Sequence, residues 1–289
     1  MSFFFKSKKS HSRAQRIIYL WYMKQSAYYR NKVIWITGAS SGIGAELALQ
    51  LAKQDAKLVL SARDVLKLNE LKDQLSNPDQ HMVLPLDLSQ LNEVSNFTDQ
   101  ILAKFGRIDI LINNGGISQR ASAHETEMEV NRQLMEVNFF GNITLAKAVL
   151  PIFRKQKSGQ YLIVSSIAGK FGFHLRSIYS ASKAALVGYY ESLAMEEATN
   201  GIKVTIAYPG KINTPISKSA LTASGQAHGT MDRNQATGMP VEHCVGLMLE
   251  ALAKGKREVL IGGKELIAVY LKRFLPRLFW KIIPKQSAT

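Results

Sequence analysis

The chain has 289 residues, 46% of them hydrophobic, enough apolar material for one large core or two small ones. A single cysteine, Cys244, excludes an internal disulfide and fits a reducing compartment; we expect a buried helix residue rather than a nucleophile. The six histidines lack the spacing of metal ligands, so no metal site is expected.

Both ends of the chain are basic and contain many aromatic and aliphatic residues. Residues 1–32 carry eight Lys or Arg and no acid, and residues 264–289 carry six and one acid, so the ends hold most of the net charge of +15. Neither end has an unbroken apolar stretch of about 20 residues, so neither is expected to span a membrane. The first also lacks the small-residue cleavage site of a secretory signal.

Basic amphipathic segments with Trp and Phe are typical of peripheral anchors on anionic lipid. We therefore expect a cytoplasmic protein with peripheral contact to a membrane surface. The alternative is that the C-terminal segment covers the substrate pocket or a subunit interface. Nucleic-acid binding is not expected, because the near-neutral body of the chain has no basic stripe.

Between the ends, apolar strand-like runs alternate with helical runs. This pattern predicts an α/β fold: a doubly wound, Rossmann-like parallel sheet of about seven strands with helices on both faces. No linker-like segment divides the chain, so we expect one catalytic domain over 31–263, between an N-terminal extension (1–30) and a basic amphipathic C-terminal segment (264–289). The expected strands are Val33–Thr37, Leu58–Ala62, His81–Leu86, Ile108–Ile112, Gln160–Ser165, Lys203–Tyr208 and Glu258–Ile261.

A glycine-rich turn, Gly38-Ala-Ser-Ser-Gly42-Ile-Gly44, follows the first expected strand and precedes a strong helical pattern. This layout places a pyrophosphate on a helix N-terminus, with glycines allowing close approach of the backbone. The spacing differs from the commoner G-x-G-x-x-G fingerprint, and a purely structural tight turn is the alternative.

Tyr179 and Lys183 are four residues apart, about one helical turn, and thirteen residues after Ser166. An ammonium beside a phenol favours the phenolate and lowers the phenol's pKa. Such a tyrosine can exchange a proton with an alcohol or ketone near neutral pH, while a nearby serine holds the substrate oxygen. On its own, the pair could equally lie on the surface of an amphipathic helix.

Together these features resemble the short-chain dehydrogenase/reductase family in its single-domain form, over residues 31–263, and the basic ends are similar to those of its membrane-associated NADP-dependent reductases. The family's signatures occur in order as Thr37–Gly44, Asp87-Leu88, Asn113–Gly116, Asn138, Ser166 with Tyr179 and Lys183, and Pro209-Gly210 followed by Thr214. One departure is Gly115, where the family usually has alanine; we expect a looser turn without a lost contact.

The resemblance implies hydride transfer between a nicotinamide and a carbonyl or secondary alcohol. Tyr179 would be the acid or base, Lys183 would lower its pKa and bind the nicotinamide ribose, Ser166 would orient the substrate oxygen, and Asn138 would complete a proton relay. The implied cofactor-binding residues are Gly38, Ser40, Ser41, Gly42, Ile43, Gly44, Arg63, Asp87, Leu88, Asn114, Gly115, Gly116, Tyr179, Lys183, Pro209, Gly210, Ile212 and Thr214.

The choice of cofactor depends on the end of the second strand. Related enzymes that use NAD carry an acid at the position of Ala62, whereas this chain has alanine followed by Arg63. A guanidinium there pairs well with a 2′-phosphate, so NADP is favoured over NAD; a solvated arginine is the alternative. Asp87 resembles the residue that meets the adenine amino group, and its alternative is an ordinary helix cap.

The substrate is less defined by the sequence. Phe171, Phe173, Leu175 and Ile117 are expected near the pocket mouth, with Phe171 and Phe173 as substrate-binding residues beside Ser166 and Tyr179. The long polar segment 211–240 is expected to act as a lid. An apolar, lipid-like ketone or alcohol fits this pattern. A soluble broad-specificity carbonyl reductase and a non-catalytic nucleotide-binding protein are the alternatives, and a homodimer or homotetramer is expected.

Overall fold

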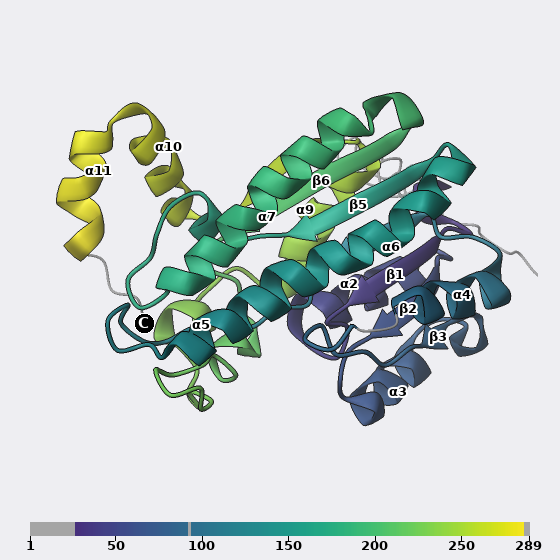
Figure 1. The fold of residues 1–289 in the computed structure, drawn as a ribbon, viewed down its shortest axis with the longest axis horizontal. Coiled ribbons are helices and arrows are strands. Elements are labelled where there is room, and N and C mark those ends of the chain that lie inside the picture. The colour runs from purple at the N-terminus through teal and green to yellow at the C-terminus, as the bar shows by residue number, and fades with distance from the viewer. Residues whose placement is uncertain (1–26, 92–93, 286–289) are drawn as a thin grey trace, which may run out of the picture.

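The computed structural model describes residues 27–91 and 94–285. Seven parallel strands form one sheet in the order β3-β2-β1-β4-β5-β6-β7, and this confirms the doubly wound α/β fold (Figure 1). The strands are β1 (Val33–Thr37), β2 (Lys57–Ser61), β3 (Met82–Val83), β4 (Ile110–Asn113), β5 (Gly159–Val164), β6 (Ile202–Pro209) and β7 (Glu258–Ile261).

Helices cover both faces of the sheet, because alternate residues of each buried strand point to opposite sides. In β1, Ile34 and Ile36 pack in one apolar cluster with α2 (Gly42–Ala52) and α9 (Val241–Ala253), whereas Val33 and Trp35 pack in the other with α4 (Val94–Phe105), α6 (Gly141–Gln156) and α7 (Ser177–Glu196). The helices are α2 (Gly42–Ala52), α3 (Val65–Gln74), α4 (Val94–Phe105), α5 (Met128–Met135), α6 (Gly141–Gln156), α7 (Ser177–Glu196), α8 (Arg233–Ala236), α9 (Val241–Ala253), α10 (Ile267–Phe274) and α11 (Pro276–Ile282). Cys244 is buried in α9, as expected, and burial raises the pKa of its thiol to about 12.

The strand order reverses between β1 and β4, so the crevice outside their carboxyl ends is where open α/β sheets bind ligands. The glycine-rich turn follows β1, and the predicted Asn113–Gly116 signature follows β4. These two segments, which are far apart in the sequence, therefore lie at the same edge of the sheet.

The third strand is much shorter than the predicted His81–Leu86. Backbone pairing to β2 continues beyond it, since Leu84 N donates to Leu60 O at 2.9 Å and Leu86 N donates to Ala62 O at 3.2 Å. Pro85, between them, has no N–H, and a proline is tolerated here because β3 lies at the edge of the sheet. The other strands are within two residues of their predicted bounds.

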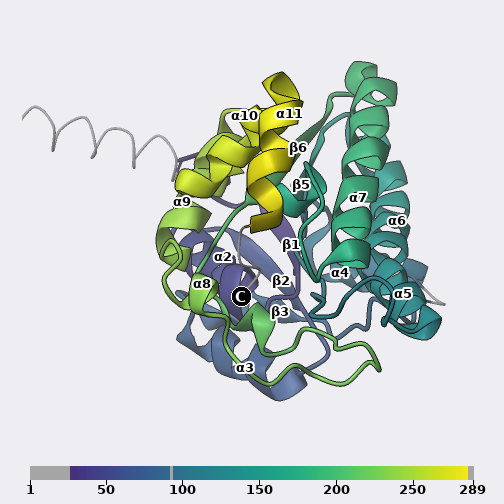
Figure 2. The same ribbon diagram turned by 90° about the vertical axis from the view of Figure 1, so that its left-hand side faces the viewer.

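The packed domain starts before the predicted boundary at residue 31. Tyr29 is fully buried and its hydroxyl donates to Leu249 O at 2.7 Å, while Tyr28 donates to Gln160 Oε1 at 2.6 Å. At the other end, α10 and α11 form a helical pair beside the carboxyl end of β6 (Figures 1 and 2). In the part of the chain that the structure describes, no helix is both long and apolar enough to cross a bilayer.

Candidate active site

The glycine-rich turn is packed directly against the end of β4. Thr37 Oγ1 accepts hydrogen bonds from the N–H groups of Asn114 and Gly115, both at 3.0 Å, and Asn114 Nδ2 donates to the carbonyls of Thr37 and Gly38 at 3.0 and 3.2 Å. Gly38 has φ of +64°, and a Cβ there would lie 2.7 Å from Gly115 Cα. A Cβ on Gly44 would lie 2.1 Å from Gly38 O, so only glycine fits at either position.

The turn at Gly115 is more tightly packed than we expected from a glycine in place of the usual alanine. A Cβ at this position would lie 2.6 Å from Leu88 Cδ1, so the Leu88 side chain occupies the space that an alanine methyl would need. The glycine and the leucine are therefore complementary in volume. Asp87 Oδ1, next to Leu88, accepts from Ser89 N at 2.9 Å and from Ser89 Oγ at 2.7 Å, so one carboxylate oxygen makes both bonds of this local turn.

Asn138 lies in a single turn of π-helix, Glu136–Phe140, between α5 and α6. Its fully buried amide accepts from Ile117 N at 2.8 Å and donates to Ile117 O at 2.9 Å and to Ser182 Oγ at 3.0 Å. These bonds hold the segment after β4 against α7. A Cβ on Gly116 would lie 2.9 Å from Asn138 Oδ1 and 3.5 Å from Lys183 Nζ, so the backbone there passes close to both.

Ser166, Tyr179 and Lys183 converge on one cleft. Ser166 follows β5 and its hydroxyl donates to Pro209 O at 3.3 Å. Lys183 is buried in α7, and its ammonium donates to Val164 O at 2.9 Å and lies 5.8 Å from the centroid of the Tyr179 ring. Burial lowers the pKa of Lys183 from 10.5 to about 8. A lysine with this pKa can release its proton near neutral pH.

The expected lowering of the Tyr179 pKa by Lys183 is wrong for this structure. Burial raises the pKa of the phenol, and this outweighs the opposing effects of a hydrogen bond with Ser166 and of the charges of Arg176 and Arg120. The Lys183 ammonium is directed at the carbonyl of Val164 rather than at the phenol oxygen.

The cleft brings ten of the predicted site residues together. They are Ile43, Asn114, Gly116, Ser166, Tyr179, Lys183, Pro209, Gly210, Ile212 and Thr214. Gly38 and Gly42, whose φ is +53°, shape the turn behind it, and Ser40, Ser41 and Gly44 belong to the same turn and the start of α2. Arg63, exposed, follows β2 farther along the same sheet edge. Phe171 and Phe173 are not part of the cleft lining; they stack on each other with centroids 4.7 Å apart.

Four lining residues were not predicted: Val164, Ser165, Ile216 and Gln235. Gln235 comes from α8, within the segment 211–240 that the sequence predicts to be a lid, and no hydrogen bond within the described residues reaches its buried Oε1. Glu265 is the one acidic residue of the basic C-terminal segment. It accepts a hydrogen bond from Lys211 N at 2.9 Å and so fixes the turn after β6. A glutamine or an acid in a polar loop carries no sequence signal for such a role.

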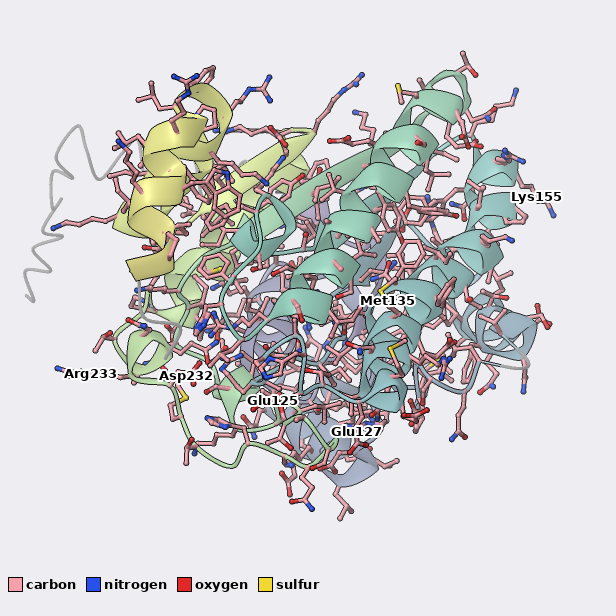
Figure 3. The ribbon with its side chains drawn as sticks, turned by 60° about the vertical axis from the view of Figure 1, so that its left-hand side comes forward. Glu125, Glu127, Met135, Lys155, Asp232 and Arg233 are labelled. Carbon is pink, nitrogen blue, oxygen red and sulfur yellow. The ribbon has the colours of Figure 1, made fainter. Side chains whose placement is uncertain are left out.

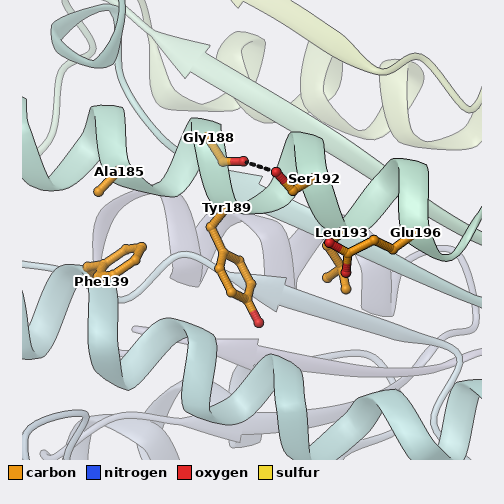
Figure 4. Close-up of a pocket in the computed structure, with 7 residues that line it drawn as sticks. All are labelled: Phe139, Ala185, Gly188, Tyr189, Ser192, Leu193 and Glu196. Carbon is orange, nitrogen blue, oxygen red and sulfur yellow. Dashed lines mark hydrogen bonds between the residues drawn. The ribbon is translucent and has the colours of Figure 1, made fainter.

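A larger hollow, of about 390 Å³, lies away from this chemistry on the outer face of α7 (Figure 4). It is lined by Phe139, Ala185, Gly188, Tyr189, Ser192, Leu193 and Glu196. Within residues 27–91 and 94–285, no three His, Cys, Asp or Glu side chains are grouped as metal ligands.

A family model described as short chain dehydrogenase matches residues 32–224. The chain belongs to this family. A Drosophila melanogaster relative named dehydrogenase/reductase SDR family protein 7-like is 37% identical over 94% of this chain and 86% of its own. The human dehydrogenase/reductase SDR family member 7 is 41% identical over 88% of this chain and 77% of its own.

Solved structures of short-chain dehydrogenases have the same fold. One from Streptomyces avermitilis is 29% identical with a TM-score of 0.74, covering 87% of this chain and 95% of that one. Another, from Burkholderia phymatum and solved in complex with NAD, has a TM-score of 0.78 over 90% of this chain and 99% of that one, at 23% identity. Because this chain belongs to the short-chain dehydrogenase family, it is an oxidoreductase.

Proposed function

We propose that this enzyme transfers a hydride between a nicotinamide cofactor and a carbonyl or secondary alcohol. The observation that carries the proposal is the convergence of Ser166, Tyr179 and Lys183 on one cleft beside the glycine turn. The bound nicotinamide supplies or accepts the hydride. The protein supplies the proton and the orientation of the substrate.

The residues present fit such a cofactor. The turn over residues 38–44 has no space for side chains at Gly38 and Gly44, and it leads into the N-terminus of α2, where backbone N–H groups attract phosphate. Asn114, Thr214 and the buried Oε1 of Gln235, which has no hydrogen-bond partner among the described residues, offer polar groups to the rest of the cofactor. Lys183 offers a donor for a ribose hydroxyl.

In carbonyl reduction, the Tyr179 phenol donates its proton to the substrate oxygen while the Ser166 hydroxyl donates a hydrogen bond to the same atom. In oxidation the phenolate takes the proton back. Lys183, with its pKa near 8, can return a proton to the tyrosine. Asn138 holds Ile117 and Ser182 in place around this pair, a positioning role that supports the relay.

Tyr179→Phe tests the function directly. We expect turnover to fall by at least a hundredfold, within the range that general acid–base catalysis contributes, and cofactor affinity to stay within a few-fold. Tyr270→Phe is the matched control, because that exposed phenol of α10 lies outside the cleft. Turnover of the Tyr179 variant close to that of the wild type would remove the basis for the proposal.

We infer that NADP is preferred over NAD. Arg63 is exposed at the end of β2, and the neighbouring Asp64 accepts from Lys67 N at 3.1 Å and pairs with Lys67 Nζ at 2.9 Å, so that this carboxylate is already engaged.

Removing a charge-assisted contact to phosphate costs about 1.5–3 kcal/mol, roughly ten- to a hundredfold in affinity. Arg63→Ala should weaken NADP binding by this factor and NAD binding far less, whereas Arg107→Ala, outside the cleft, should change neither. Equal losses for both cofactors would argue against a contact with the 2′-phosphate.

For the substrate we propose an apolar, lipid-like ketone or alcohol. The stacked pair of Phe171 and Phe173 follows Ser166 closely in the chain, and Phe171 also meets Phe279 of α11 edge to face at 5.2 Å. Neither ring lines the cleft, but Ile43, Val164, Ile212 and Ile216 do, and an apolar lining favours an apolar ligand. A screen of steroid, retinoid and fatty-acyl carbonyls against small water-soluble ones separates this proposal from a soluble broad-specificity carbonyl reductase.

We further propose that the protein lies on the cytoplasmic surface of an anionic membrane through α10 and α11. These helices expose Ile267, Tyr270, Phe274, Leu278 and Trp280, with Leu275 exposed between them, and they carry Lys272, Arg273, Arg277 and Lys281. Apolar insertion and basic charge act together on such a surface. The predicted contribution of residues 1–26 lies outside the described residues.

Sedimentation with anionic vesicles tests the membrane contact. Phe274→Ser with Trp280→Ser should release the protein, while Leu66→Ser, equally exposed but on α3, should not. Wild-type protein that stays in the supernatant at low salt would contradict the proposal.

A homodimer or homotetramer is proposed on the face of α7 shown in Figure 4. The hollow there and the exposed Phe140 and Met195 beside it present apolar surface. Phe140→Asp should lower the mass measured by sedimentation velocity, and an unchanged mass would place the interface elsewhere.

A further inference from the structure

A buried ion cluster links the lid to the body of the domain. Asp232, immediately before α8, accepts from Arg120 Nε at 2.9 Å and from an Arg176 terminal nitrogen at 3.1 Å, and a second guanidinium nitrogen of Arg120 also contacts it. Exposed fractions of the three side chains are 1% for Asp232, 2% for Arg120 and 16% for Arg176. Figure 3 labels Asp232 beside Arg233, the next residue, which is exposed instead.

The cluster adjoins the catalytic tyrosine through the backbone. Gln119 Oε1 accepts from the N–H groups of Ile178 and Tyr179 at 3.0 and 3.4 Å, so the residue before Arg120 binds the first turn of α7. Ala121 N donates to Leu175 O at 3.2 Å and joins the same two segments. Both arginines are thereby held at fixed positions relative to the phenol.

The cluster carries two cations and one carboxylate. Asp232 Oδ1 receives no hydrogen bond within the described residues, and the nearest ring nitrogen of His228 lies 3.8 Å from it. The other polar or charged groups around Tyr179 are Lys183 on the same helix and Ser166 after β5. The charges of Arg176 and Arg120 both act to lower the pKa of the half-buried Tyr179 phenol, against the larger effect of burial.

We propose that Arg120 and Arg176 stabilise the phenolate form of Tyr179 and that Asp232, carried by the lid, limits how much of their charge acts on it. The proposal rests on the proposed function, in which Tyr179 exchanges a proton with the substrate. In oxidation, the Tyr179 phenolate oxygen takes the hydroxyl proton of the alcohol, and the hydride of the alcohol carbon would pass to the oxidised nicotinamide. Because Asp232 is paired with both arginines, the segment 211–240 supplies the carboxylate that tunes the catalytic proton transfer.

Charge changes on the two sides of the cluster have opposite consequences. In the oxidation direction, kcat/KM falls on the acid side as the essential phenolate gains its proton. Arg120→Gln removes a cation, so the apparent pKa of this fall at low pH (the acid limb of the profile) should rise by on the order of one pH unit. Asp232→Asn removes an anion, so the same limb should move down. Arg120→Lys keeps the charge and should stay near the wild-type profile.

The experiment measures the pH profile of kcat/KM for these variants and for Arg154→Gln, whose ion pair with Glu197 lies at the far end of α7. A purely structural role would weaken activity or thermal stability in both cluster variants without opposite movements of the limb. Shifts in the same direction, or no shift, overturn the proposal. If Arg120→Gln does not fold, Asp232→Asn and Arg120→Lys still test it, since the first must move the limb down and the second must not.

The outcome can be separated from failure of the proposed function. Turnover retained by Tyr179→Phe would contradict the function itself. An inactive Tyr179→Phe enzyme together with unmoved limbs in the cluster variants would contradict only the role of the arginines and Asp232.

Discussion

Replacing Lys183 with methionine removes a buried ammonium while keeping most of the volume of its stem. Lys183 is 4% exposed, and burial lowers the pKa of its side chain from 10.5 to about 8. Below pH 8 the folded protein therefore holds a desolvated charge, whereas the unfolded chain holds a hydrated one. The wild-type enzyme without cofactor should be less stable at neutral pH than at high pH because of this one group.

The sign and size follow from proton linkage. Between pH 8 and 10.5 the unfolded chain binds the Lys183 proton and the folded protein does not, so the free energy of unfolding rises with pH. At about 1.36 kcal/mol per pH unit, the rise from pH 7 to pH 10 amounts to roughly 2.5 kcal/mol. Lys183→Met lacks the titrating group, so the difference in unfolding free energy between wild type and variant should change by this amount.

Denaturant unfolding at several pH values between 7 and 10 measures this difference for cofactor-free protein. Lys147→Met is the matched control, because Lys147 is exposed on α6 and its charge remains hydrated in the folded protein. A wild-type-minus-variant difference that stays constant over this pH range would refute the reasoning, and so would a difference that falls as pH rises. Either result would mean that Lys183 is not a desolvated cation that can give up its proton near neutrality.

Two further substitutions test the packing around the site and at the sheet. Gly115→Ala should destabilise the fold by about 1–2 kcal/mol in thermal unfolding, since its methyl would lie 2.6 Å from Leu88 Cδ1; combining it with Leu88→Ala should relieve this overlap, and an unaffected single variant would show that Leu88 moves freely. Tyr29→Phe should cost about 1–2 kcal/mol, because Leu249 O would lose its 2.7 Å hydrogen bond; unchanged stability would mean that Tyr29 adds little to the core.

The sheet was predictable because each of its central strands is short, apolar and buried on both sides. β1 and β7 have the predicted bounds, and the others differ where hydrogen bonding rather than hydrophobicity sets the end. At β3 the apolar run continues through Pro85. Proline has no backbone N–H to donate to a neighbouring strand, so the hydrophobic pattern alone predicted a longer strand than the structure has.

The candidate site was predictable only in part. The proposed catalytic trio of Ser166, Tyr179 and Lys183 lies within eighteen residues, and a spacing of one helical turn indicates which side chains share a face. The Arg120–Asp232 pair joins residues 112 apart, and the Tyr29–Leu249 bond joins residues 220 apart. No local pattern predicts such contacts, because they depend on how loops return to the sheet edge. The direction of the Tyr179 pKa shift failed for the same reason, since burial is a tertiary property.

The C-terminal segment and the active site are mechanically connected at two points. Glu265 binds Lys211 N at the start of the lid, and a Cβ on Gly210 would lie 2.4 Å from Glu265 Oε1, so the turn fits closely against this carboxylate. Phe279 of α11, almost fully buried, packs on Phe171 just beyond Ser166. A membrane contact at the exposed side of α10 and α11 would therefore act both on the start of the segment 211–240 and on the Phe171–Phe173 pair that follows Ser166. Because an apolar substrate dissolves in the membrane, the same surface that anchors the enzyme would present its pocket to the phase in which that substrate is concentrated.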